Sequence, residues 1–269
     1  MNLDLSFKLN FTMSLAKEAG EILMYHYGNL KNIRQKSRVD LVSEADLASE
    51  KLIVEKIQSQ FPTHDIMTEE QDFKSKGSDW TWVIDPLDGT TNYVHSLPIF
   101  AVSIGLKYKS ETVIGVVYNP AVDAMYHAVI DKGAFRNGDE IHVSKTKKLG
   151  DSFLVTGFAY DHNDEWELSF DLFRDIYRKS QGIRRLGAAA LDLCFVAQGR
   201  FDGFFEINLF PWDITAGDLI LREAGGFTSG WKGENLPASG KKVLATNGII
   251  QDEILDIFQN EKYTLFTNY

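Results

Sequence analysis

The chain has 269 residues, 44% of them hydrophobic and 25% charged, which is the composition of a folded globular protein rather than a disordered one. Its formal net charge of −10 argues against a nucleic-acid-binding surface, because such surfaces are normally basic. The same charge would repel an anionic substrate unless bound divalent cations neutralised it locally.

Helical periodicity marks the start of the chain. Apolar residues recur at helical spacing over residues 5–28, which predicts an amphipathic helix. A basic loop is expected over residues 31–38. Ser43 is a candidate cap for a second helix over residues 44–60, and a short strand is expected over residues 64–68.

Strand periodicity replaces helical periodicity from Trp80 onward. The loops are short, which favours antiparallel neighbours. The Asn137-Gly138 pair is the strongest short hairpin signal. The predicted strands cover residues 80–85, 99–108, 111–118 and 123–130.

Helices and strands alternate in the second half, which predicts a second sheet flanked by helices. The expected strands cover residues 152–156, 181–185, 202–207 and 242–246, and the expected helices cover residues 165–178, 188–198, 213–224 and 249–258. A basic connector over residues 145–148 suggests a boundary. We therefore predict an N-terminal α+β subdomain, residues 1–143, and a C-terminal α/β subdomain, residues 144–269, that act as one unit.

The most informative stretch covers residues 82–92, where a hydrophobic strand ends in two carboxylates. Asp85 and Asp88 are three residues apart, and Pro86 restricts the turn between them. Carboxylate and carbonyl oxygens are the ligands that Mg²⁺ prefers. The following Gly89-Thr90-Thr91 offers N–H groups and hydroxyls to an anion. A cation site beside an anion cradle predicts a phosphate ester that is bound and cut.

Two further acidic positions complete a candidate metal centre. Glu69-Glu70 follows the short strand, and Asp213 follows Pro211-Trp212 at the start of a helix. Together with Asp85 and Asp88 they provide enough oxygens for about two to three Mg²⁺ ions. Such a site would hydrolyse a phosphoester with two metals, one helping to generate hydroxide and the other stabilising the leaving oxygen.

Each of these positions also has an ordinary structural explanation. Asp213 could be a helix N-cap, and Glu69-Glu70 could be solvated loop charge. Residues 85–89 could form a plain turn, because Asp, Pro and Gly are all turn formers. Their joint occurrence favours the metal interpretation.

Two longer segments resemble the signatures of the inositol monophosphatase family. Residues 82–95, WVIDPLDGTTNYVH, are similar to the first signature, and residues 212–217, WDITAG, running on to EAGG at 223–226, are similar to the second. Residues 39–46 and Glu69-Glu70 match further family elements in the expected order. The similarity covers nearly the whole chain, and the two signatures together are highly specific.

The resemblance implies a Mg²⁺-dependent, lithium-sensitive phosphatase that forms a homodimer. The implied fold is a layered αβαβα sandwich in the α/β (α+β) class. It has a mostly antiparallel N-terminal sheet with helices, followed by a second mixed sheet flanked by helices.

The resemblance also implies a set of metal ligands. Glu69, Asp85 and the Leu87 carbonyl look like ligands of the first ion. Asp85, Asp88 and Asp213 look like ligands of the second ion. Glu69 additionally resembles a ligand of a third, loosely held ion.

Further positions resemble the family's catalytic and substrate-binding residues. Thr90, hydrogen-bonded to Asp46, resembles the group that activates the nucleophilic water together with Glu69. The residues expected to contact the phosphate or the alcohol half of the substrate are Asp88, Gly89, Thr90, Thr91, Gly187, Ala188, Ala189, Glu206 and Lys36.

One departure from the family concerns specificity. Animal members place a histidine three residues before the second-signature aspartate, whereas this chain has Phe210 followed by Pro211. We expect a phosphomonoesterase with myo-inositol monophosphate as the default substrate. An aromatic ring near the leaving group also favours NADP, 3′-phosphoadenosine phosphate or fructose 1,6-bisphosphate. The non-enzymatic alternative is a regulatory partner in RNA processing or transcription.

The remaining expectations concern compartment and partners. No apolar run approaches the ~20 residues that span a bilayer, and the first residues lack signal-peptide features. The single cysteine, Cys194, excludes an intramolecular disulfide and is expected to be a buried structural thiol. We therefore expect a soluble cytoplasmic protein that acts on a small molecule and binds neither nucleic acid nor membrane.

Overall fold

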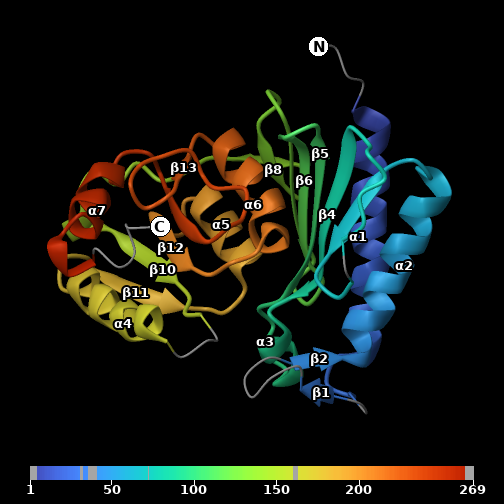
Figure 1. Cartoon of the computed structure of the whole chain (residues 1–269), viewed down its shortest axis with the longest axis horizontal. Helices are drawn as coiled ribbons and strands as arrows, with labels where there is room; N and C mark the ends of the chain where they lie inside the picture. Colours follow the sequence, from blue (N-terminus) through green and yellow to red (C-terminus); the bar gives the residue numbers. More distant parts are fainter. Residues whose placement is uncertain (1–4, 31–32, 36–40, 72, 160–162, 264–269) are drawn as a thin grey trace.

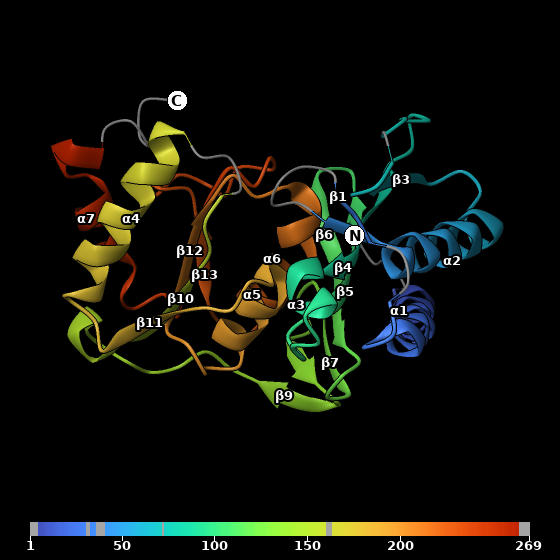
Figure 2. The ribbon, with the colours of Figure 1, turned by 90° about the horizontal axis from the view of Figure 1, so that it is seen from below.

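Five alternating layers of helices and sheets make up the fold (Figures 1 and 2). The computed structural model describes residues 5–30, 33–35, 41–71, 73–159 and 163–263. One pair of helices covers the outer face of the first sheet, a second pair lies between the sheets, and a third covers the far face of the second sheet. In that order the pairs are α1 (Ser6–His26) and α2 (Glu44–Gln60), α5 (Ala189–Ala197) and α6 (Pro211–Glu223), and α4 (Asp164–Tyr177) and α7 (Gln251–Phe258). The predicted αβαβα sandwich is confirmed.

The first sheet is mostly antiparallel, as predicted. Within the described residues its order is β3-β4-β5-β6-β7-β8-β9, and only β3 and β4 run parallel. Its last two strands form the hairpin that Asn137-Gly138 predicted, with φ angles of 50° and 90° at the two turn residues. The strands are β3 (Asp65–Thr68), β4 (Trp80–Asp88), β5 (Ala101–Tyr108), β6 (Glu111–Asn119), β7 (Ala124–Val129), β8 (Ala134–Arg136) and β9 (Asp139–Ile141).

The second sheet is mixed, which also confirms the prediction. Its order in the described part of the chain is β11-β10-β12-β14-β13. The strand β10 pairs in parallel with β11 and β12, whereas β14 pairs antiparallel with β12 and β13. The strands are β10 (Phe153–Thr156), β11 (Gly182–Arg185), β12 (Gly203–Ile207), β13 (Phe227–Ser229) and β14 (Lys242–Thr246).

Glycines let helix α6 lie directly on the first sheet. A Cβ atom at Gly115 would stand 2.5 Å from the Ala216 carbonyl oxygen, and one at Gly105 would stand 2.5 Å from Thr215 Cγ2. This close approach brings the start of α6 to the end of β4. One of the buried hydrophobic clusters, which contains Val117 of the first sheet and Phe204 of the second, continues through α5 and α6. The subdomain boundary at residue 143 stays a prediction.

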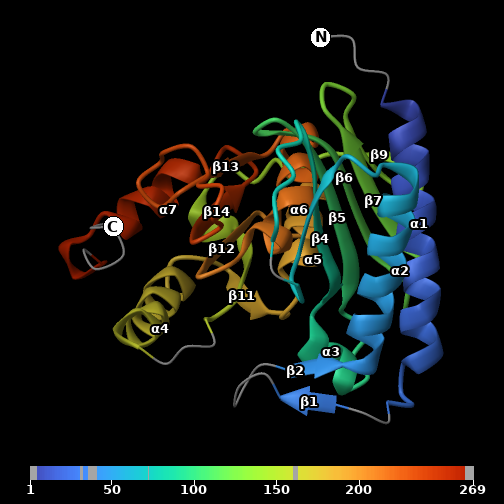
Figure 3. The same cartoon turned by 45° about the vertical axis from the view of Figure 1, so that its right-hand side comes forward.

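Four short elements, two of them paired with each other, were not predicted from the sequence. The expected loop over residues 31–38 contains β1 (Ile33–Gln35), which pairs antiparallel with β2 (Leu41–Ser43). The expected turn after Asp88 continues into α3 (Thr90–Val94), which lies beside β1 and β2 (Figure 3). The strand β13 was also missed. Elements of three to five residues are too short to show a hydrophobic period.

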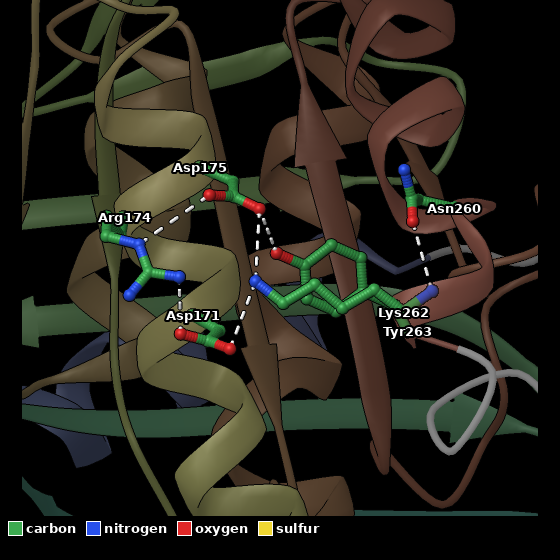
Figure 4. A network of polar contacts seen from close by, with 6 residues as sticks. All are labelled: Asp171, Arg174, Asp175, Asn260, Lys262 and Tyr263. Atoms are coloured by element: carbon green, nitrogen blue, oxygen red, sulfur yellow. Dashed lines mark hydrogen bonds and ion pairs between the residues drawn. The ribbon is translucent and has the colours of Figure 1, made fainter.

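A polar network ties the end of the described chain to helix α4 (Figure 4). The hydroxyl of Tyr263, in the 3₁₀ turn Glu261–Tyr263, donates to Asp175 Oδ2 at 2.6 Å. Lys262 pairs with Asp171 at 3.0 Å and with Asp175 at 3.4 Å. A second 3₁₀ turn, Leu149–Asp151, precedes β10. No described helix is both long and apolar enough to cross a bilayer.

Candidate active site

One cavity opens where the ends of β4 and β12 meet the starts of α3, α5 and α6. Its volume is about 150 Å³. The described residues that line it are Glu69, Asp85, Leu87, Asp88, Gly89, Thr90, Thr91, Phe158, Ala159, Arg185, Gly187, Ala188, Ala189, Glu206, Ile207, Asn208, Leu209, Phe210, Trp212 and Asp213. Residues from both halves of the sequence therefore line the same cavity.

The end of β4 supplies two buried carboxylates. The register between β4 and β5 shifts between Asp85 and Asp88, so the strand is irregular at this point. Asp85 is 2% exposed, and its Oδ1 accepts a hydrogen bond of 2.9 Å from the Leu87 N–H. The Pro86 carbonyl accepts a hydrogen bond from the Ser49 hydroxyl of α2. The two carboxylates are thus held on the irregular end of a paired strand rather than on a turn or a free loop.

Asp88 caps a helix that belongs to the other half of the chain. Its Oδ1 accepts from the Ala189 N–H at 3.1 Å and its Oδ2 accepts from the Ala190 N–H at 2.9 Å. These N–H groups are unsatisfied donors of the first turn of α5, where the N-cap residue Ala188 has no side-chain acceptor. The carboxylate therefore joins β4 to α5 while each oxygen keeps a second lone pair.

Gly89 allows the chain to turn sharply between β4 and α3. Its φ is 86°, in the left-handed region that glycine adopts without a steric penalty. A Cβ atom there would also stand 2.9 Å from the Ile99 carbonyl oxygen. Both observations require a glycine, and together they set the N–H groups of residues 89–91 at the cavity wall.

Thr90 connects this wall to helix α2. Its Oγ1 lies 3.1 Å from Asp46 Oδ1 and 3.1 Å from the Leu87 carbonyl oxygen, so the hydroxyl proton has two acceptors. Asp46 is 1% exposed and does not line the cavity. The structure thus contains the Thr90–Asp46 hydrogen bond that the resemblance implied.

Asp213 is the third residue of α6 rather than its N-cap. Phe210 is the N-cap and Pro211 follows it. Asp213 Oδ2 accepts a hydrogen bond of 2.8 Å from the Phe210 N–H, which is the returning half of a capping box. The N-cap interpretation considered for Asp213 is therefore wrong, although the side chain supports the helix start from its third position and also lines the cavity.

The carboxylates of the cavity hold their protons unusually tightly. Burial raises the pKa of Asp88 to about 7, although the N–H groups at the start of α5 oppose the shift. Burial and the neighbouring charges of Glu69, Asp88 and Asp213 raise the pKa of Asp85. Burial also raises the pKa of Asp213. The protein groups around the cavity therefore do not fully stabilise the negative charge of these three carboxylates.

Glu206, at the end of β12, shares this environment. Burial raises its pKa to about 8, and the positive charge of Arg185 limits the shift. Its carboxyl packs over Gly157, where a Cβ atom would stand only 2.1 Å from Glu206 Oε1. Burial likewise raises the pKa of Asp192 on α5, whose Oδ1 is buried with no hydrogen-bond partner among the described residues.

The donor chemistry of the cavity fits a divalent cation. Its carboxylate and carbonyl oxygens are hard ligands, and a bound cation would offset the charge that raises their pKa values. In the described residues, however, no group of three or more His, Cys, Asp or Glu side chains has an arrangement that could hold a metal ion. Backbone N–H groups engage an oxygen of each of Asp85, Asp88 and Asp213.

The cavity brings together most of the residues that were singled out from the sequence. Glu69, Thr91, Gly187, Ala188 and Ala189 line it with those described above. Lys36 lies outside the described residues. The roles assigned to all these residues stay predictions.

Sequence reasoning missed several lining residues. Phe158 and Arg185 come from segments that carry no recognisable motif, and only the packing of the second sheet brings them to the cavity. Trp212 was expected to pack beside Asp213, and its ring stacks on Phe210 with centroids 4.9 Å apart and planes at 7°. Cys194 is buried and free, as predicted.

Comparison with known proteins gives a consistent result. A model of the inositol monophosphatase family matches residues 4–263. The fructose-1,6-bisphosphatase/inositol-1-monophosphatase of Aquifex aeolicus is 40% identical over 244 residues, which are 90% of this chain and 91% of that protein. The Nus factor SuhB of Pasteurella multocida is 40% identical over 255 residues, 93% of this chain and 95% of that protein.

A solved structure of the IMPase of Thermotoga maritima superposes with a TM-score of 0.88 at 35% identity. The match covers 96% of this chain and 99% of that one. Family, relatives and fold therefore agree over nearly the whole length.

Proposed function

Because the chain belongs to the inositol monophosphatase family, we propose that it is a Mg²⁺-dependent phosphomonoesterase of small phosphate esters, with myo-inositol 1-phosphate as the first candidate substrate. The observation that carries the proposal is the convergence of Glu69, Asp85, Asp88 and Asp213 on one cavity beside Gly89 and Thr90. These residues come from three separate segments, around residue 69, residues 85–90 and residue 213, so their meeting is not a by-product of sequence proximity.

Each side chain has a part in this proposal. Glu69, Asp85, Asp88, Asp213 and the Leu87 carbonyl would hold about two to three Mg²⁺ ions. When bound, such ions supply charge neutralisation and Lewis-acid activation at the phosphoryl group.

The remaining groups orient the reactants. Asp46 fixes the Thr90 hydroxyl, which would orient the attacking water together with Glu69, and the Glu69 carboxylate would accept the proton of that water. The N–H groups of Gly89 and Thr90 would hold the phosphoryl oxygens as charge develops on them. Glu206 and residues 187–189 would contact the alcohol half of the substrate.

Phosphate release tests the proposal directly. Purified protein is incubated with inositol 1-phosphate, NADP, fructose 1,6-bisphosphate and 3′-phosphoadenosine phosphate, with Mg²⁺ or with EDTA. We expect Mg²⁺-dependent release from at least one compound and none with EDTA. Release from none of them in Mg²⁺ would refute the proposal.

Lithium provides a second test. Li⁺ should inhibit by occupying a cation position after the leaving group departs, as the family resemblance implies. Phosphate release is compared in LiCl and NaCl at equal ionic strength. Equal rates in the two salts would mean that the cation site differs from the proposed one.

A second substrate class is favoured by the aromatic wall of the cavity. Phe210 stacks on Trp212, and Phe158 stacks on Phe170 with centroids 4.4 Å apart. Such rings would stack on a nucleobase more readily than they would bind a cyclitol hydroxyl. NADP or 3′-phosphoadenosine phosphate is therefore the second candidate, and kcat/KM across the same panel separates the two classes.

A regulatory function is the non-enzymatic candidate, supported by the relative named Nus factor SuhB. The retention of Asp85, Asp88 and Asp213 favours catalysis, since a binding protein does not need them. Asp88→Asn should abolish turnover, and a cellular function that survives this change would support the regulatory alternative. We also propose a cytoplasmic homodimer, to be tested by light scattering and by cell fractionation.

A further inference from the structure

The carboxyl group of Glu206 occupies the place that a side chain at position 157 would take. A Cβ atom added to Gly157 would stand 2.1 Å from Glu206 Oε1, 2.2 Å from Oε2 and 2.3 Å from Cδ. Cβ atoms essentially never come within 3.0 Å of another heavy atom, so all three carboxyl atoms overlap with that position. The carboxyl group can therefore lie where it does only while residue 157 has no side chain.

The pairing of the strands explains why these two residues meet. Thr156 of β10 is paired in parallel with Phe205 of β12, so the next residues along, Gly157 and Glu206, come side by side. On the other side of β12, Glu206 is paired with Val243 of β14, whose side chain is fully buried. The carboxyl group thus lies over the one strand neighbour that lacks a side chain.

The backbone of Gly157 is held in place, whereas the carboxyl above it is not. Gly157 is buried, and the hydroxyl of the preceding Thr156 donates to the Phe205 carbonyl of β12. Gly157 is not among the residues with positive φ, so alanine can adopt the same backbone conformation. The Glu206 carboxyl is the end of a flexible side chain. An added Cβ would therefore displace this carboxyl rather than the backbone.

The surroundings of Glu206 determine where a displaced carboxyl can go. Burial and then the nearby charge of Glu206 raise the pKa of Asp192 on α5, so a movement toward α5 would bring like charges closer together. Val243 fills the space on the β14 side. The cavity is the open side, since Glu206 lines it together with residues 187–189. A displaced carboxyl would therefore enter the space proposed for the alcohol half of the substrate.

We propose that position 157 determines substrate specificity, because the absent side chain of Gly157 leaves the place in which the Glu206 carboxyl lies and thereby sets how far this carboxyl reaches toward the alcohol half of the substrate. Gly157 does not line the cavity, so it is a positioning residue that acts through Glu206. The inference rests on the proposed phosphatase activity and adds the residue that controls one contact with its substrate.

The test is a double-mutant cycle on phosphate release from inositol 1-phosphate in Mg²⁺. Gly157→Ala should raise KM about tenfold or more, the scale of a lost hydrogen bond to a charged group. It should change kcat by less than about twofold, because a contact with the alcohol half exists both before and during the reaction. Glu206→Asp shortens the side chain and removes the overlap. Adding Gly157→Ala to Glu206→Asp should therefore change KM by less than about twofold.

Gly230 provides a matched control. A Cβ atom there would stand 2.1 Å from Glu234 Oε1, so Gly230→Ala creates the same overlap with a glutamate carboxyl. Gly230 also lacks a positive φ, and neither Gly230 nor Glu234 lines the cavity. Gly230→Ala should therefore change neither KM nor kcat. If another compound of the panel is cleaved best, the same cycle is measured with that compound.

Three kinetic results would overturn the inference. A wild-type KM in Gly157→Ala would mean that the carboxyl does not depend on position 157. An equal rise of KM in the wild-type and Glu206→Asp backgrounds would mean that Gly157 acts independently of Glu206. A lower kcat with an unchanged KM would place the disturbance at the proposed metal site instead.

A crystal structure of Gly157→Ala decides the geometry without any activity. The inference requires the Glu206 carboxyl to have moved toward the cavity, and a carboxyl in its original place beside a shifted backbone would refute it. If Gly157→Ala does not fold, recovery of folding in the double variant with Glu206→Asp would support the overlap, and failure of both would refute it. If wild type cleaves none of the compounds, the proposed function fails on its own, and the crystal structure still decides where the carboxyl lies.

Discussion

The Asp88 carboxylate accepts a hydrogen bond of 2.9 Å from the Ala190 N–H, and so a proposed metal ligand at the end of β4 also caps helix α5. The two residues are far apart in the sequence and belong to different halves of the fold. Because the middle helix layer is anchored to the proposed metal site, the geometry of that site is set by the packing of both sheets. The same hydrogen bond limits how freely Asp88 can turn toward a cation.

The first prediction concerns Mg²⁺ affinity and pH. Burial raises the pKa of Asp88 to about 7, so a cation must displace a proton when it binds near or below neutral pH. With one such proton, the apparent affinity should fall about tenfold from pH ~8 to pH ~6. Calorimetric titration in buffers of different ionisation enthalpy measures both affinity and proton release. An affinity that is the same at both pH values would contradict the prediction.

The second prediction concerns the Thr90–Asp46 pair. Thr90→Val keeps the side-chain shape but removes the hydroxyl that bonds Asp46, so kcat should fall by about 100-fold, the scale of positioned acid–base catalysis. Thr90→Ser keeps the hydroxyl and should retain most of the activity. Steady-state phosphate release with saturating Mg²⁺ measures both variants. If Thr90→Val is as active as Thr90→Ser, the hydroxyl has no catalytic role.

The third prediction concerns stability. The raised pKa of Asp192 means that this residue destabilises the fold at neutral pH and that the effect disappears as pH falls toward the unfolded-state pKa of about 4. Asp192→Asn should therefore stabilise the metal-free protein by about 1–3 kcal/mol near pH 8, and the gain should shrink near pH 4.

Chemical denaturation at several pH values measures this effect. Asp202 is the matched control, because its buried carboxylate accepts hydrogen bonds from Ser144 Oγ and the Phe153 N–H. Asp202→Asn should destabilise the protein. A loss of stability in Asp192→Asn near pH 8 would show that its carboxylate has a stabilising partner.

The fourth prediction concerns the aromatic wall. Phe210→Ala removes the ring that stacks on Trp212, so kcat/KM for NADP should fall about fivefold or more, the scale of one lost stacking contact, while inositol 1-phosphate is little affected. Phe227→Ala, at an exposed phenylalanine away from the cavity, is the control. Equal effects on both substrates would remove the argument for a nucleotide.

Much of the fold was predictable because its longer elements carry clear periods. The helix predicted over residues 44–60 has those bounds, and the Asn137-Gly138 hairpin forms as expected. The strand expected over residues 80–85 extends to Asp88, and the cavity opens at its end, since strand ends open onto cavities. What the residues could not reveal were contacts between distant segments, such as Asp88 with α5.

The surroundings of Arg185 could not be predicted from the sequence either. Its position at the end of a short strand was predicted from the sequence, but its approach to Gly187 depends on the left-handed turn of the loop. Asp213 illustrates a different difficulty, because a helix cap and a metal ligand require the same residue type at nearly the same position. The structure places Asp213 at the third position of the helix, where its carboxylate accepts from the Phe210 N–H and lines the cavity, and its role as a metal ligand stays a prediction.

The central claim is that Glu69, Asp85, Asp88 and Asp213 bind divalent cations together. Crystals soaked in Mn²⁺, with diffraction recorded at the manganese absorption edge, test it most directly. We predict anomalous peaks within coordination distance of these carboxylates and of the Leu87 carbonyl. A map with manganese only at other sites, and none beside Asp85 and Asp88, would contradict the account.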